Sequence, residues 1–142
     1  MTQMKLIKLV YISHGWYLAL SGDPLLPEAA QAWQYGPVIP TIYQRFKKYG
    51  RDPIMEMAFD SETRSYPYPE SQEIIQFLEK IWSVYGQYDG LRLSALTHQV
   101  NTPWYTTWHD KGGKRVSQVP ISNDLIRQHY KDKIAAESGH EA

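Results

Sequence analysis

The chain has 142 residues, about the commonest size of a single domain, and it contains no cysteine. A chain of this length buries enough surface to fold without a disulfide or a metal, and it has no thiolate nucleophile and no thiolate metal site. Fifteen basic and fifteen acidic residues give a net charge of zero, which argues against a protein whose affinity depends on neutralising many phosphates.

Charge is unevenly distributed along the chain. Residues 1–50 carry five basic and two acidic side chains, residues 51–90 carry three and eight, and residues 91–142 carry seven and five. In a protein-binding module, the acidic stretch from Asp52 to Glu73 would steer a basic partner protein, because complementary charge speeds association. Eleven tyrosines and five tryptophans also favour a protein interface, although a tyrosine-rich core accounts for most of them.

The sequence shows no sign of membrane insertion or export. No segment is apolar over about 18 residues, so no transmembrane helix is predicted. Lys8, His14 and Gly15 interrupt the N-terminal segment, so no signal peptide is predicted either. Together with the absence of cysteine, these features favour a cytoplasmic location.

Apolar residues recur at helical spacing from Met4 to Leu20, and they form two rows. We expect such a helix to lie at the centre of the domain, because more than one neighbour must pack against it. Gly15 and Ala19 allow another backbone to approach closely, and Gly22 ends the helix. The first row is Leu6, Leu9, Val10, Trp16, Tyr17 and Leu20, and the second is Ile7, Tyr11, His14 and Leu18.

The next two segments are punctuated by proline and glycine. Residues 28–35 lack a clear period and predict a short extended or irregular segment that ends in a Gly36-Pro37 turn. Pro40 then opens a helix that Gly50 ends. Residues 51–69 are polar and acidic with three prolines, which predicts a surface loop with room for a short hairpin around Met57–Tyr66.

Four capping signals organise the rest of the chain. Ser71 and Asp89 are predicted to cap helices over residues 72–85 and 90–99, and Thr102-Pro103 opens a short helix before Gly112-Gly113. After an extended segment, Ser122 is predicted to cap the last helix. The predicted inward residues of the first two helices are Ile74, Ile75, Leu78, Ile81, Trp82 and Tyr85, and Leu91, Leu93 and Leu96.

These elements predict one mainly helical domain of five or six helices over residues 1–136, with a central N-terminal helix and a short hairpin or extended segments. No internal repeat or linker is found. Residues 137–142 are expected to fray as a C-terminal tail.

Candidate catalytic groups are few. No two of the five histidines have the i, i+4 spacing of a helical zinc pair, and no phosphate-binding loop or serine nucleophile elbow occurs. His98, His109 and Asp110 leave a metal-assisted hydrolase open as a minor alternative, although adjacent residues of a helix point in different directions. We therefore predict no enzyme activity, no cofactor and no metal, and we expect His14 to be a hydrogen-bonded core residue.

A nucleic-acid-binding regulator is a second alternative. The candidate patch has two tyrosines, Tyr43 and Tyr49, beside four basic residues, and such a pattern can stack bases and contact phosphates. The basic residues are Arg45, Lys47, Lys48 and Arg51. The same pattern occurs in any amphipathic helix with a basic C-terminus, and the zero net charge argues against it.

The segment Ala32–Tyr43 reads A-W-x-x-G-P-V-x-P-x-x-Y, and it presents aromatic side chains around a rigid Gly-Pro corner. Further distinctive blocks are Met4–Tyr11, Gly15–Ala19, Tyr49-Gly50, Leu96–Gln99, Pro103-Trp104, Pro120-Ile121 and Leu125-Ile126. Over nearly its whole length the chain thus resembles the Panacea domain, the SocA-like antitoxin domain common in prophages and bacterial toxin–antitoxin loci.

The resemblance implies a protein that binds and neutralises a toxic protein encoded by an adjacent gene. One family member delivers its toxin to a ClpXP-type protease, so a protease adaptor role stays open as well. The implied toxin-binding residues are Trp33, Tyr35, Gly36, Pro37, Tyr43, Trp104 and Trp108, while Lys5, Lys8, Tyr11, His98 and Pro103 are family-motif residues with a functional or a structural role.

Two qualifications accompany this expectation. Trp33 and Trp104 have an alternative role, in which they pack against each other and hold the Gly-Pro corner and the Thr-Pro-Trp turn. Relatives usually carry a helix before the motif that starts here at Met4, so we expect exposed apolar surface for a partner or a second copy of the chain.

Overall fold

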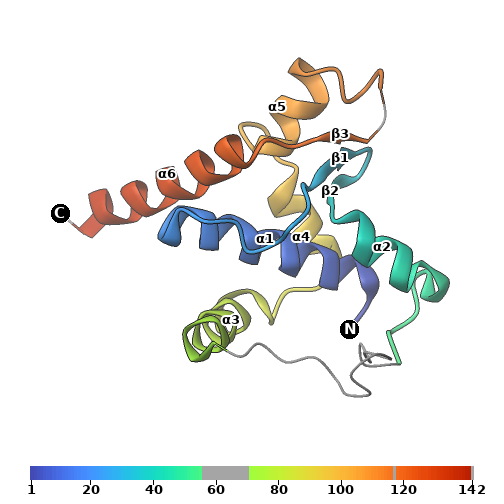
Figure 1. The fold of residues 1–142 in the computed structure, drawn as a ribbon, viewed down its shortest axis with the longest axis horizontal. Coiled ribbons are helices and arrows are strands. Elements are labelled where there is room, and N and C mark those ends of the chain that lie inside the picture. Colours follow the sequence, from blue (N-terminus) through green and yellow to red (C-terminus); the bar gives the residue numbers. More distant parts are fainter. Residues whose placement is uncertain (56–70, 117, 142) are drawn as a thin grey trace.

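The structure is a computed structural model that describes residues 1–55, 71–116 and 118–141, with side chains up to residue 136. The described residues form a mainly helical domain with one small antiparallel sheet, as predicted (Figure 1). In chain order the elements are α1 (Gln3–Ser21), β1 (Gln31–Trp33), β2 (Gly36–Val38), α2 (Pro40–Phe46), the 3-10 helix η1 (Lys47–Tyr49), α3 (Gln72–Tyr85), α4 (Gly90–Thr97), α5 (Pro103–Asp110), β3 (Val119–Pro120) and α6 (Asn123–Glu141).

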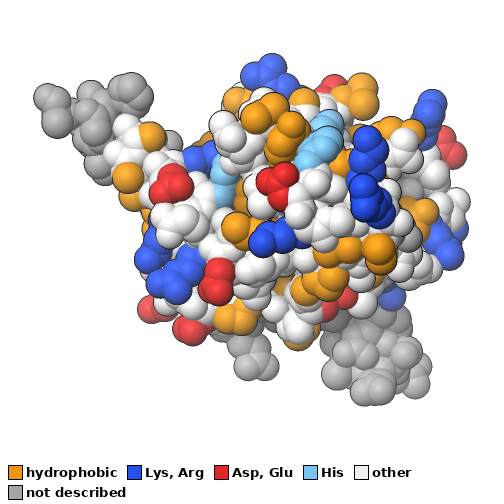
Figure 2. All heavy atoms as spheres, turned by 90° about the horizontal axis from the view of Figure 1, so that it is seen from above, with side chains coloured by type: hydrophobic (Ala, Val, Ile, Leu, Met, Phe, Trp, Pro, Cys, Tyr) orange, Lys and Arg blue, Asp and Glu red, His pale blue; other side chains and the backbone are white. Residues whose placement is uncertain are grey.

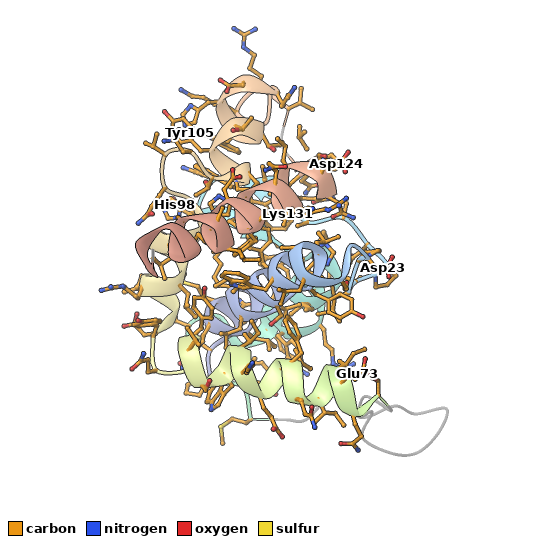
Figure 3. The ribbon with its side chains drawn as sticks, turned by 90° about the vertical axis from the view of Figure 1, so that its left-hand side faces the viewer. Asp23, Glu73, His98, Tyr105, Asp124 and Lys131 are labelled. Atoms are coloured by element: carbon orange, nitrogen blue, oxygen red, sulfur yellow. The ribbon has the colours of Figure 1, made fainter. Side chains whose placement is uncertain are left out.

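Helix α1 is central, as its two apolar rows predict. It packs against α4 and α6 most extensively and also against α2, α3 and β2, and α3 and α6 lie on opposite sides of it (Figure 3). The second row is buried throughout, whereas in the first row only Leu9 is buried and Leu20 is exposed. Gly22 ends the helix with a φ of 82°, the left-handed conformation that glycine adopts readily.

Another helix packs closely against α1 at Gly15, but the space that the sequence predicts for a backbone is occupied by the ring of Tyr130. A Cβ atom at this position would lie 2.5 Å from Cδ2 and 2.9 Å from Cζ of Tyr130 on α6. Tyr130 is buried and packs against Trp16 with the ring centroids 5.1 Å apart. The absence of a side chain at Gly15 therefore sets how closely α1 and α6 pack.

The hairpin of the fold lies at residues 31–38, where an extended or irregular segment was the prediction. Strand β1 pairs with β2 on one side and with β3 on the other, both antiparallel. Gly36 follows the two-residue turn with a φ of 122°, a conformation that side chains rarely adopt. The hairpin considered for Met57–Tyr66 lies outside the described residues.

The predicted caps are confirmed. The side chains of Ser71, Asp89 and Thr102 accept hydrogen bonds from backbone N–H groups in the first turns of α3, α4 and α5, and Ser122 does the same for α6. Pro40 occupies the first turn of α2, and the final turn of the predicted helix is the 3-10 helix η1.

The predicted inward faces of α3 and α4 are wrong in part. Of the α3 face only Ile81 is buried, and Trp82 is 52% exposed. In α4, Leu93 is buried but Leu91 is exposed. Helix α3 packs mainly against α1. One neighbouring helix covers only part of the apolar stripe of α3, so the rest of the stripe stays exposed.

His14 is a core residue, as predicted, and its two ring nitrogens join three parts of the fold. The backbone N–H of Leu26 donates to Nδ1 at 3.3 Å, and therefore Nε2 carries the proton and donates to Oδ1 of Asn123 at 2.9 Å. Burial lowers the pKa of His14, and the hydrogen bond to Asn123 opposes this effect. The neutral ring is the form that fits the folded protein.

Acidification should consequently destabilise the protein through His14. The pKa of His14 in the folded protein lies below its ordinary value of 6.5, so the unfolded chain takes up the proton first as pH falls. We expect the contribution of His14 to the free energy of unfolding to be constant above this value and to fall by roughly 1–2 kcal/mol below it, the scale of the hydrogen bond that protonated Nδ1 no longer accepts. Urea unfolding from neutral to acidic pH measures the slope.

The control is His14→Gln, in which the part of the slope due to His14 should be absent. His129, whose pKa burial also lowers, contributes equally in both proteins and cancels. An identical pH slope in the two proteins would exclude His14 as the responsible group.

Candidate functional site

A pocket of about 360 Å³ lies between the first half of α1, the β1–β2 hairpin and α2. Its walls are largely apolar, and Lys8 is the charged residue of the lining. The main wall residues are Ile7 from α1, Trp33, Tyr35 and Val38 from the hairpin, and Tyr43 from α2.

Three neighbouring helices hold the hairpin in place. The ring of Trp33 meets Tyr43 of α2 edge-on with the centroids 4.8 Å apart. The indole Nε1 of Trp104 on α5 donates to the carbonyl oxygen of Trp33 at 2.6 Å, and Oγ of Ser94 on α4 donates to the carbonyl oxygen of Tyr35 at 3.0 Å. The turn is therefore rigid, yet the side chain of Tyr35 is 73% exposed.

Lys8 is a buried residue of the pocket lining. Only 4% of its surface is exposed, and its Nζ donates to the carbonyl oxygen of Pro37 at 2.7 Å. Burial lowers the pKa of Lys8 to about 7, because an ammonium group loses its hydration there. At neutral pH the amine is thus divided between its charged and neutral forms.

Gly36 leaves the space that Lys8 occupies. A Cβ atom on Gly36 would lie 2.9 Å from Lys8 Nζ and 3.5 Å from Nδ1 of His98. Gly36 also has a positive φ. The close approach of Lys8 and this backbone conformation both explain why the corner has a glycine. His98 in turn contacts Oγ of Ser94 at 3.4 Å.

The structure divides the predicted toxin-binding residues into two groups. Trp33, Tyr35 and Tyr43 line the pocket together, and Gly36 and Pro37 form the buried strand beside it. Trp104 and Trp108 do not line it.

Trp104 has the contacts of a structural residue. It is 5% exposed, it bonds to the Trp33 backbone, and its ring stacks on that of the half-buried Trp108 with the centroids 5.6 Å apart. These contacts match the alternative in which Trp104 holds the Gly-Pro corner, although the contact reaches the backbone of Trp33 rather than its ring.

The family-motif residues lie in different environments. Lys5 donates to the carbonyl oxygen of Gly86 at 2.6 Å, and Pro103 is the first residue of α5. Tyr11 is buried with no hydrogen-bond partner for its hydroxyl among the described residues, and burial raises its pKa. Of these residues Lys8 alone reaches the pocket, with His98 on the other side of Gly36.

Sequence reasoning did not identify Lys8 as a pocket residue. The signal was its spacing, since Lys8 stands three and four residues before the buried Tyr11 and Ile12 and so lies on the buried face of α1. A lysine at such a position is rare, because burying an ammonium group is costly.

The described residues bear on the two alternative function classes as well. They contain no group of three His, Asp or Glu side chains that could hold a metal ion, and Asp23, Glu73 and Asp124 lie well apart in Figure 3. On the face shown in Figure 2, basic, acidic and hydrophobic side chains are interspersed rather than forming one basic band. Within the described part of the chain, no helix is long and apolar enough to cross a membrane.

Two basic residues of α2 and η1 contact aromatic neighbours within their own helices. Arg45 lies over the ring of Phe46 and Lys48 over that of Tyr49, with 5.6 and 5.4 Å to the ring centroids. Most of the acidic stretch between Asp52 and Glu73 lies outside the described residues, so electrostatic steering by it stays a prediction.

Residues 6–105 match the protein family described as antitoxin SocA-like, Panacea domain. The chain belongs to this family. It is also 26% identical over 135 residues to the protein named antitoxin SocA from Caulobacter vibrioides (strain NA1000 / CB15N), covering 92% of this chain and 72% of that protein. No solved structure matches it.

The part of the chain that matches the Panacea domain contains the hairpin and the residues that hold it. Lys8, Trp33, Tyr43 and Trp104 all lie within residues 6–105, whereas Trp108, β3 and α6 lie beyond them. The pocket is therefore built almost entirely from the matched region.

Proposed function

We propose that this Panacea domain is an antitoxin that neutralises a cognate toxic protein by binding it directly, with the β1–β2 hairpin and its pocket as the contact surface. The observation that carries the proposal is the exposed Tyr35 at the tip of a rigid turn, next to an apolar pocket of about 360 Å³. The similarity to a protein named antitoxin SocA supports the class of partner.

The physical argument concerns rigidity. Aromatic side chains on a rigid backbone make strong interface contacts, because little conformational entropy is lost when they are buried. The hairpin meets this condition, since α2, α4 and α5 each contact it. Tyr35 and the exposed parts of Trp33 and Tyr43 would contact the toxin, while Gly36, Pro37 and Trp104 position them.

Co-expression tests the proposal. We expect the protein encoded by the adjacent open reading frame to stop cell growth when it is expressed alone, and growth to return when this chain is supplied from a second plasmid. Rescue in cells that lack ClpXP-type proteases separates direct neutralisation from protease delivery. A toxic neighbour that well-expressed wild-type chain does not rescue would contradict the antitoxin function.

Tyr35→Ala tests the contact surface. We expect it to weaken binding of the purified toxin by about tenfold to a hundredfold, the usual effect of removing an aromatic anchor, and to abolish rescue at limiting expression. The matched control is Leu20→Ala, which removes an exposed side chain near the other end of α1. Equal affinity of wild type and Tyr35→Ala would place the contact elsewhere.

A further inference from the structure

The buried amine of Lys8 is a feature that direct toxin binding alone does not explain. We propose that the pocket is a carboxylate-binding site, in which Lys8 pairs with a carboxylate of the toxin while the apolar walls hold the group next to that carboxylate. For the source of the carboxylate this inference rests on the proposed function, but the site itself is testable without the toxin.

Lys8 has unused hydrogen-bonding capacity. A lysine ammonium group carries three N–H donors, and the structure shows one of them bonded to the carbonyl oxygen of Pro37. Lys8 is one of the residues that line the pocket, so we infer that the other donors can reach an occupant. The backbone of β2 thus fixes the position of the amine and leaves room for a second acceptor.

Lys8 also lacks a negative partner among the described residues. Burial is the cause of its lowered pKa, and no neighbouring acidic group of the described chain raises it. A cation taken out of water without a counter-charge is costly, and a carboxylate from a ligand would offset that cost. Charge complementarity therefore selects an anionic occupant over a neutral one.

The walls determine which anion fits. Ile7 and Val38 are aliphatic, and Trp33 and Tyr43 form an aromatic corner, so the wall offers few groups that could bind a strongly hydrated ion such as phosphate. An ion pair shielded from water is stronger than one at the surface. An apolar group that carries a carboxylate matches both the amine and the walls, and the volume lies within the usual range for ligand pockets.

The surrounding groups keep the amine in this position. Gly36 separates Lys8 from His98, the residue that follows α4, and any side chain at position 36 would occupy the space next to Nζ. Ser94 bonds to Tyr35 and contacts His98, so α4 supports both sides of the corner. Among the described residues, the carbonyl oxygen of Pro37 accepts from Lys8 and His98 lies on the other side of Gly36, while Tyr35 and Tyr43 line the same pocket.

The first experiment uses 3-phenylpropionate as the probe and 3-phenylpropanamide as its neutral counterpart. Below pH 7, where Lys8 is mainly protonated, we expect the carboxylate to bind at least tenfold more tightly than the amide by calorimetric or NMR titration. This preference should disappear in Lys8→Met and persist in Lys47→Met, which removes an exposed lysine of η1.

Three results would overturn the proposal. They are equal affinity of wild type for the two probes, no binding of the carboxylate at millimolar concentration, and a carboxylate preference that survives in Lys8→Met. Thermal unfolding of each variant shows that it is folded, so a lost preference is not caused by unfolding.

The second experiment identifies the source of the carboxylate in the toxin. Lys8→Met should weaken toxin binding at least tenfold, and this effect should be absent when the paired carboxylate is removed from the toxin. Asp→Asn and Glu→Gln changes test side chains, and a one-residue extension tests the chain end. If Lys8→Met bound the toxin as tightly as wild type does, the toxin would not be the source of the carboxylate. If instead the probes show the preference but growth is not rescued, the antitoxin function fails and the carboxylate site stands.

Discussion

Lys8→Met is expected to raise the free energy of unfolding at pH 7 by about 1–3 kcal/mol while it weakens binding at the pocket. Burial lowers the pKa of Lys8 from 10.5 to about 7, and at pH 7 this shift costs the folded protein roughly 4 kcal/mol. Methionine fills a similar volume without charge. Part of the gain is lost, because the carbonyl of Pro37 loses its hydrogen bond, at about 1–3 kcal/mol.

The stability difference between Lys8→Met and wild type should depend on pH. The pKa of Lys8 is lower in the folded protein than in the unfolded chain, so between about 7 and 10.5 the unfolded chain holds the extra proton. Wild-type stability should therefore rise with pH across this window, relative to Lys8→Met, and be lowest below it. The advantage of methionine should vanish as pH approaches the upper end.

Urea unfolding of both proteins at neutral and at alkaline pH measures the difference. Lys47→Met is the matched control, and because Lys47 is exposed we expect a change within about 0.5 kcal/mol at either pH. A destabilised Lys8→Met at pH 7 would show that the amine is structural, since its bond to Pro37 would then outweigh the cost of burying it. If Lys8→Met is more stable than wild type but binds the pocket ligand poorly, Lys8 serves binding at the cost of stability.

Gly15→Ala is expected to destabilise the fold by about 2–3 kcal/mol. The new methyl group would overlap the ring of Tyr130, which is buried and packed on Trp16 and cannot move aside without disturbing the α1–α6 contact. Helix propensity alone predicts the opposite sign, a gain of up to about 1 kcal/mol for alanine over glycine. The sign of the measured change therefore decides between the two effects.

A double-mutant cycle isolates the steric contribution. In a Tyr130→Val background the ring is absent, and Gly15→Ala should become neutral or stabilising. Chemical unfolding of the four proteins gives the coupling energy. If Gly15→Ala destabilised both backgrounds equally, contact with Tyr130 would not be its cause.

Local features of this fold could be predicted from the sequence because their causes lie within a few residues. Ser71, Asp89 and Thr102 each accept a backbone hydrogen bond three residues along the chain, so a cap needs no tertiary contact to be predictable. Gly22 likewise ends α1 through its own backbone conformation.

Burial was less predictable, because the periodicity of a helix shows which side is apolar but not how much of that side a neighbour covers. Trp82 belongs to the apolar stripe of α3 and is half exposed, since α1 is the main element that packs against this helix. Leu91 and Leu20 are also exposed, because both lie near the end of a helix, where no neighbouring element of the described chain covers them.

The candidate site shows the same division. The aromatic residues around the Gly-Pro corner were predicted together because Trp33, Tyr35 and Tyr43 lie within eleven residues of one another. Trp104 was placed with them on the strength of the family resemblance, and the structure makes it a buried support of the hairpin.

By itself the sequence determined the helical class, the caps and ends of the helices, the central position of α1 and the resemblance to the Panacea domain. Only the tertiary structure decided that the hairpin forms at residues 31–38, that Tyr130 fills the space at Gly15, and that Lys8 becomes a buried residue in the lining of an apolar pocket. The physical reason is that capping and periodicity act over one or two turns. The burial of Lys8 depends instead on a carbonyl 29 residues away, which the chain brings to it only on folding.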